Sequence, residues 1–224
     1  MSQPVSSPLP RAADLITLHD RLLAAAGWPA TEPALPTERG HVDLWHWVQT
    51  NHRFNCRLWA EEDLARRTTV DDAEIAANKR AIDGFNQARN DATERIDEIC
   101  LIALGLVDPV SARADAPMST VPAGARLNSE TAGSIIDRMS IMALKVHAMR
   151  MQTERRDVDA AHTEASRIRL ARLQQQRADL GDCLDALIAD ALAGRAYFKV
   201  YRQFKMYNDP RFNPALVLET KARG

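Results

Sequence analysis

The sequence predicts an all-α fold, a single-domain antiparallel helical bundle of five to six helices with a short C-terminal helix and tail. Apolar residues recur at spacings of three and four over long stretches, which is the period of an amphipathic helix. Glycine and proline gather between these stretches, so little room is left for strands. The 224 residues suffice for one well-buried core. We therefore expect one domain over 11–214, a disordered N-terminus over 1–10 and a C-terminal tail over 215–224.

Capping residues and proline-containing loops place the individual helices. A short amphipathic helix with Leu15 and Leu22 on its apolar face runs up to Gly27, and a loop with three prolines follows as far as Gly40. Residues 108–127 hold three more prolines and form a second loop. The remaining helical segments are 43–67, capped by Asp43; 71–107, opened by Asp71 and Glu74; 129–151, capped by Ser129; 157–194, ended by Gly194; and a last short helix over 195–207.

Composition and charge are those of an ordinary globular protein. The apolar content is 46% and the charged content 26%. A net charge of −1 argues against a polycation for nucleic acid, so we do not expect a nucleic-acid partner. Three cysteines without a Cys-x-x-Cys spacing argue against a disulfide framework or a zinc knuckle. The longest apolar run, 99–107, is too short to cross a bilayer, and the first ten residues resemble no secretory signal, so a cytoplasmic location is expected.

Polar residues occupy helix faces that should belong to the core. In the segment 43–67, the stripe that holds Trp45, Val48 and Trp59 continues into charged residues without changing face. Solvated charges would lie opposite the tryptophans. The polar members of this stripe are His52, Asn55, Glu62, Asp63 and Arg66.

The next helix carries a polar ridge beside its apolar stripe. The ridge consists of Asp83, Asn86, Asn90, Glu94 and Asp97, and Arg89 interrupts the stripe itself. Asparagine is a poor helix former, so its recurrence in mid-helix suggests that it binds something. A solvated flank is the alternative interpretation.

The segment 129–151 is apolar on nearly every side, which is typical of a helix in the middle of a bundle. Yet Glu130, Asp137 and Lys145 lie along one side of it, with Arg138 at the edge. Charges in an apolar interior need partners, because an unpaired charge there costs several kcal/mol, of order 3–5. Two interpretations stay open, a ligand site with polar walls on three helices and a structural ion network.

The C-terminal region from Tyr197 to Phe212 contains six of the twelve aromatic residues and four basic residues. The spacing of Tyr197 and Tyr201 places them on one helical face, where they would pack, while Arg202 and Lys205 project beside them. Folded back over the bundle, this segment would form a positively charged lid for an anionic ligand, above all phosphate. The alternative is a clasp that only docks helices.

Four sequence runs carry a resemblance to a known family. The runs are LWAEEDLARR, KRAIDGFNQARNDATERID, LNSETAGSIIDRMSIMALK and YRQFKMYNDPRFNP. Together they resemble an uncharacterised bacterial helical family, domain of unknown function 4254. The resemblance extends from about residue 51 to 214 and implies one all-α domain, with a hint of a pathway of cell-envelope glycans in Gram-negative bacteria.

A second similarity is to the all-α nucleotide pyrophosphohydrolases, which hold magnesium with paired acids on adjacent helices. Glu94 and Asp97 are similar to the second pair of that family. The first pair has no counterpart, since Glu61, Glu62 and Asp63 are consecutive and cannot share a helix face. Magnesium is the cofactor that this similarity implies.

Our leading hypothesis is a polar interior cleft that binds a phosphorylated small molecule, either a nucleotide or a nucleotide-sugar, with an enzymatic role left open. The alternative is a non-catalytic interaction protein in which the same charges form a structural network and the helices pack into a homodimer. The acids assigned to acid–base or metal chemistry are Glu62, Asp63, Glu94, Asp97 and Asp137; the ligand-binding residues are His52, Asn55, Arg66, Asn86, Arg89, Asn90, Glu130, Arg138, Lys145, Arg202 and Lys205.

Overall fold

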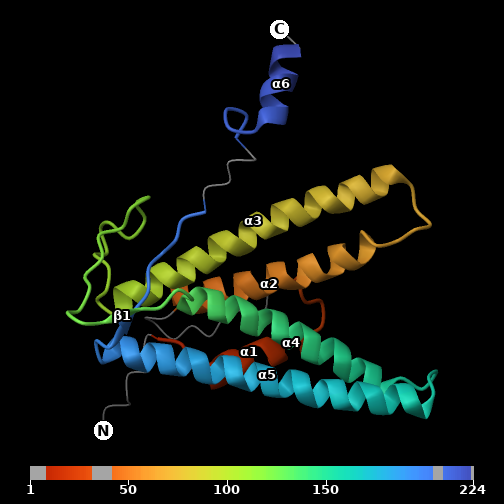
Figure 1. Cartoon of the computed structure of the whole chain (residues 1–224). Coiled ribbons are helices and arrows are strands. Elements are labelled where there is room, and N and C mark those ends of the chain that lie inside the picture. Colours follow the sequence, from red (N-terminus) through yellow and green to blue (C-terminus); the bar gives the residue numbers. More distant parts are fainter. Residues whose placement is uncertain (1–8, 32–41, 204–208, 223–224) are drawn as a thin grey trace.

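The computed structural model describes residues 9–31, 42–203 and 209–222, and within these ranges it is all-α, as predicted (Figure 1). The elements are α1 (Ala12–Ala24), α2 (Val42–Leu64), α3 (Asp72–Ala103), β1 (Arg126–Leu127), α4 (Ala132–Glu154), α5 (Ala160–Leu192), β2 (Ala196–Tyr197) and α6 (Pro214–Ala222). Among the described residues, no helix is long and apolar enough to cross a membrane.

Two long antiparallel hairpins dominate the structure. The first consists of α2 and α3, the second of α4 and α5, and they spread apart away from the end that carries β1 (Figure 1). Helix α1 packs on α4 and α5. Apolar side chains from α1, α3, α4 and α5 form one core, with Leu15, Ile96, Ile136 and Leu184 completely buried. Leu9, in the segment expected to be disordered, is also buried in this core.

The capping chemistry explains where most helices begin and end. Asp71 caps α3 as predicted, and its carboxylate accepts a 2.8 Å hydrogen bond from the Glu74 backbone N–H. Helix α4 is capped by Thr131 instead of Ser129, because Thr131 and Ser134 form a reciprocal capping box. Helix α5 is capped by Asp159 instead of Asp157. Gly194 follows α5 with a positive φ of 68°, which suits a residue without a side chain.

The predicted helix over 195–207 is wrong in its described part. After Gly194 the chain turns back, and β2 pairs in parallel with β1. The Arg126 and Asn128 backbone N–H groups donate to carbonyls of Arg195 and Tyr197, so this backbone pairs across to a neighbouring segment rather than along a helix. Residues 198–203 continue as an extended segment, and Lys205 lies outside the described residues. The short C-terminal helix is α6, within the range expected to be a tail.

The two hairpins come into close contact where the first turn of α4 meets α3. A Cβ atom added to Gly133 would lie 2.5 Å from the Thr93 carbonyl oxygen and 2.9 Å from the Asp97 carboxylate. Neither neighbour can retreat easily, because the first is backbone and the second is buried. Only glycine therefore allows this approach.

Gly133→Ala is expected to lower the free energy of unfolding by about 1–3 kcal/mol, because the methyl group would push α4 away from α3. Gly84→Ala is the matched control, since Gly84 lies on α3 with no atom within 4 Å of an added Cβ. That change is expected to raise the free energy of unfolding by about 0.5–1 kcal/mol. Urea denaturation followed by circular dichroism measures both. Equal effects in the two variants would contradict a requirement for glycine at 133.

Candidate functional site

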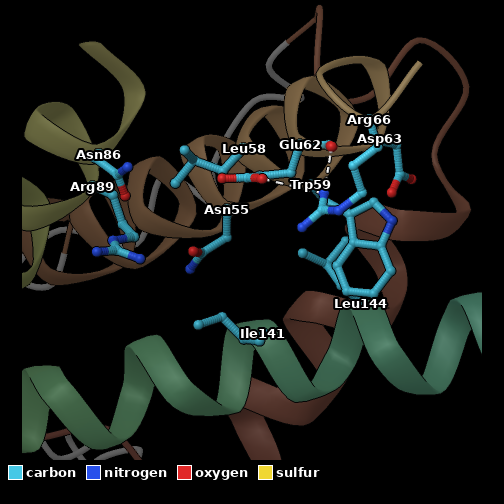
Figure 2. Close-up of a pocket in the computed structure, with 10 residues that line it drawn as sticks. All are labelled: Asn55, Leu58, Trp59, Glu62, Asp63, Arg66, Asn86, Arg89, Ile141 and Leu144. Carbon is cyan, nitrogen blue, oxygen red and sulfur yellow. Dashed lines mark hydrogen bonds and ion pairs between the residues drawn. The ribbon is translucent and has the colours of Figure 1, made fainter. Parts of the chain in front are cut away.

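A cavity of about 330 Å³ lies between α2, α3 and α4, and we call it the first cavity. The residues that α4 contributes to its lining are apolar, whereas α2 contributes both apolar and polar ones. Figure 2 shows the side chains of Ile141 and Leu144 rising from α4 toward residues of α2. The apolar lining residues are Leu58, Trp59, Ile141 and Leu144, and the polar ones are Asn55, Glu62, Asp63, Arg66, Asn86 and Arg89. All six polar residues were predicted as site residues, whereas Trp59 was assigned only to the apolar stripe.

The charged side chains around the first cavity differ in how fully they are paired. Arg66, in the turn after α2, pairs with Glu62, with 3.2 Å between Nη1 and Oε2. Arg89 has a looser partner, since its Nε lies 4.0 Å from Asp137 Oδ1 and makes no hydrogen bond among the described residues. Its Nη2 donates to the Asn90 side chain. Asp63 has no ion pair within the described part of the chain. Of the two arginines that line the first cavity, Arg89 is therefore the one with a buried N–H group that makes no hydrogen bond among the described residues.

A buried hydrogen-bond network lies beneath the first cavity. Asp137 Oδ1 accepts hydrogen bonds of 2.8 Å from the side-chain amides of both Asn51 and Asn55. The Asn55 amide also lies 3.0 Å from Ser140 Oγ, which is 2.8 Å from His52 Nδ1. We call these five residues the Asp137 network. It joins α2 to α4 and fixes Asn55 in the cavity wall.

Asn51 and Ser140 were not among the predicted site residues. A signal was available, because Asn51 and Asn55 are one helical turn apart, as are Asp137 and Ser140. Each helix thus carries two polar residues on one buried face, and such a pattern predicts hydrogen bonds between α2 and α4.

His52 lies in the interior rather than at the wall of the first cavity. Its ring stacks on the His19 ring at 4.4 Å and on Trp28 at 5.7 Å between centroids. Burial, and then the charge of Arg177, lower the pKa of His52 to about 3. The imidazole is therefore neutral at physiological pH and cannot serve as a cation for a phosphate.

Arg202 forms ion pairs inside the fold instead of a cationic lid. Its Nη1 lies 2.8 Å from Glu94 Oε2 and 2.6 Å from Glu98 Oε1, and its Nη2 donates to the Ala112 carbonyl. We call Arg202, Glu94 and Glu98 the Arg202 cluster. It fastens the extended segment 198–203 to α3 and to the loop before β1. Asn90 has a similar role, because its amide donates to the Gln203 side chain.

Asp97 anchors the N-terminus of α4. Its Oδ1 accepts a 2.6 Å hydrogen bond from the Gly133 backbone N–H, and only 5% of the residue is exposed. Neither Asp97 nor Glu94 lines a described cavity, so they are not brought to Glu62 and Asp63. In the described part of the chain, no group of three or more His, Cys, Asp or Glu side chains could hold a metal ion.

Glu130, Arg138 and Lys145 line a second cavity, of about 610 Å³, between α4 and α5. Arg138 forms an ion pair with Glu130 at its edge. Ile141 contributes to both cavities, because α4 lies between them. The polar residues that the sequence grouped on one side of this helix are thus separated. Asp137 belongs to the Asp137 network, and the other three line the second cavity. Cys183 also lines this second cavity and is exposed, unlike the buried thiols of Cys56 and Cys100.

Asp137→Ala is expected to lower the free energy of unfolding by about 2 kcal/mol, because it leaves two amide donors without their shared acceptor. Asp83→Ala is the control, since Asp83 is an exposed carboxylate on α3 and its loss should change stability by less than about 0.5 kcal/mol. Chemical denaturation of the variants compares them. If Asp137→Ala were no more damaging than the control, the network would not be what joins α2 to α4.

Asp97 is expected to make stability depend on pH. Burial raises its pKa to about 7, with hydrogen bonds from Thr131 and Gly133 opposing the shift. In the unfolded chain the pKa of an Asp carboxyl is about 3.9. Between pH values of about 3.9 and about 7, the folded protein therefore keeps a proton on Asp97 that the unfolded chain has released. This contribution to the free energy of unfolding therefore falls as pH rises through that window.

Asp97→Asn keeps an acceptor for Gly133 but removes the titration. The stability of the variant relative to wild type should therefore rise with pH by up to about 1.4 kcal/mol per pH unit within the window. Urea denaturation of both proteins at several pH values measures this difference, and other titrating groups cancel in the comparison. A difference that is constant across the window would contradict the raised pKa.

Comparison with known proteins gives one match. The model of a family described as protein of unknown function (DUF4254) matches residues 45–200, which is more than half of the chain. No curated protein and no solved structure matches it. The family match agrees with the resemblance noted in the sequence and covers both hairpins, the first cavity and the Asp137 network. The chain belongs to the DUF4254 family.

Proposed function

We propose that this protein binds a phosphorylated small molecule, a nucleotide or a nucleotide-sugar, in the first cavity. The observation that carries the proposal is the state of Arg89. Arg89 lines the cavity, and its Nε lies 4.0 Å from Asp137 Oδ1. Among the described residues this Nε makes no hydrogen bond, so its N–H group can donate to a ligand. A guanidinium offers paired donors that match the oxygens of a phosphate.

The surroundings of Arg89 suit an ordered ligand. Asn55 and Asn86 present amide groups to the same cavity, and Asn55 is fixed by the Asp137 network. Polar groups that are already oriented bind with less entropic cost than mobile ones. Ile141 and Leu144 on α4 would cover the apolar part of a ligand.

Catalysis is an extension of this proposal. Glu62 and Asp63 are the carboxylates of the first cavity, and they are the groups we assign to proton transfer. Glu94 and Asp97 are left out of this assignment, because the first belongs to the Arg202 cluster and the second anchors α4. A cytoplasmic location belongs to the same proposal.

A second candidate is a non-catalytic interaction protein that serves a biosynthetic pathway as a homodimer. The observation in its favour is that the Arg202 cluster uses predicted site residues to join parts of the fold. In such a protein the charges of the first cavity would also be structural. Light scattering measures the oligomeric state that this candidate implies.

Arg89→Gln is expected to weaken the binding of phosphorylated ligands about tenfold or more, because a charge-assisted hydrogen bond is lost. The test is isothermal titration of wild type and variant with a panel of nucleotides, nucleotide-sugars and sugar phosphates, with and without magnesium. A binder should also raise the melting temperature. Arg80→Gln is the matched control, since Arg80 is an exposed arginine on the same helix outside the cavity.

The two candidates give different results in this experiment. Binding by wild type and Arg80→Gln, together with its loss in Arg89→Gln, would support the ligand site. The absence of binding across the panel, together with a dimer by light scattering, would favour the interaction protein. Equal binding by all three proteins would contradict the assignment to Arg89.

A further inference from the structure

We infer that the ligand of the first cavity is a nucleoside phosphate, oriented with its base against Trp59 and its phosphate at Arg89. This inference rests on the proposed function and deepens it, since it names the substrate class and assigns Trp59 as the residue that determines specificity.

Trp59 differs from the other tryptophans of the chain. Trp28, Trp45 and Trp47 are partly buried and pack against the main core. Trp59 is 37% exposed and lines the first cavity, next to Leu144. Tryptophan carries the largest apolar surface of any side chain, so leaving its face open forgoes the stabilisation of burial. A planar base would cover that face by stacking, which tolerates every base because each has a π-face.

The two ends of the cavity lining differ in charge. Figure 2 shows Trp59, Asp63 and Arg66 together at one end of the labelled residues, with Arg89 and Asn86 at the other. At the Trp59 end, the Glu62 carboxylate lies 3.2 Å from Arg66 and 4.0 Å from Lys79, and Asp63 has no ion pair among the described residues. A phosphate placed beside the Asp63 carboxylate would be repelled.

The Arg89 end offers hydrogen-bond donors, because Arg89 Nε makes no hydrogen bond among the described residues and lies 4.0 Å from its partner Asp137. Arg89 is the cation of this end, and the Asn86 amide can donate to phosphate oxygens, whereas the Asn55 amide already donates within the Asp137 network. Asp63 and Glu62 can instead accept hydrogen bonds from ribose hydroxyls or from N–H groups of a base. The charge pattern therefore sets one orientation for a molecule that has a planar ring and an anionic group.

The volume of the first cavity limits the size of the ligand. A volume of about 330 Å³ is near the lower end of the range of small-molecule sites. We therefore choose a nucleoside monophosphate as the minimal ligand, with any further phosphate or sugar extending out of the cavity.

The test compares ligands that share a phosphate but differ in the base. Wild type is titrated with the ribonucleoside monophosphates, ribose phosphate and inorganic phosphate, by calorimetry and by quenching of tryptophan fluorescence. At least one nucleotide should bind about tenfold or more tightly than ribose phosphate, which is the scale of one base–aromatic stacking contact. Trp59→Phe should keep this preference but lose the quenching, and Trp59→Ala should lose the preference while ribose phosphate binding is unchanged.

The possible outcomes separate the two proposals. If ribose phosphate bound as tightly as every nucleotide, the inference about Trp59 would be overturned and the proposed phosphate site would stand. If none of the phosphorylated probes bound, both would fail. The ligand comparison on wild type decides the question even if Trp59→Ala does not fold, and circular dichroism reports whether it does.

Discussion

The close contact between α3 and the first turn of α4 is the constraint on which the remaining structure depends. Gly133 has no side chain, so the α4 backbone can approach Thr93 and Asp97, and its N–H group donates to the Asp97 carboxylate. This contact joins the two hairpins near the end where β1 and β2 also meet (Figure 1). A bulkier residue would move the whole of α4, because helices transmit displacement as rigid elements.

The Asp137 network lies one turn further along α4 and inherits its geometry from that contact. Asp137 accepts from the amides of Asn51 and Asn55 on α2, and the Asn51 amide also donates to Thr93 Oγ1 on α3, so three helices are joined over a short distance. Asn55 belongs both to this network and to the wall of the first cavity. The stability of the fold and the shape of the candidate site thus depend on the same hydrogen bonds. For this reason the stability and the ligand affinity of network variants have to be measured together.

Similar charged residues have different roles in this protein, depending on what surrounds them. Arg202 is satisfied by two carboxylates and a backbone carbonyl, whereas Arg89 has only one carboxylate, at 4.0 Å. Asp97 is buried and holds a helix end, whereas Asp63 is exposed at a cavity. A guanidinium whose donors are all used stabilises the fold, and one with donors to spare can recognise an anion. This distinction favours Arg89 over Arg202 as the binding residue.

The sequence by itself determined the all-α class, the family, and the apolar faces that carry Leu15, Ile96 and Ile136, because these depend on helical period and composition. It also placed Asn55, Glu62, Asp63, Arg66, Asn86 and Arg89 in a larger set of candidate site residues, and these six line the first cavity while the others of that set that the structure describes do not. Tertiary structure alone decided that Arg202 joins Glu94, that His52 is stacked and neutral, and that Lys145 faces a separate cavity. The period of a helix gives the face on which a residue lies. Which residues that face contacts depends on how the two hairpins are rotated against each other. It also depends on where distant parts of the backbone lie, such as the Ala112 carbonyl that accepts from Arg202 and the turn at Gly194.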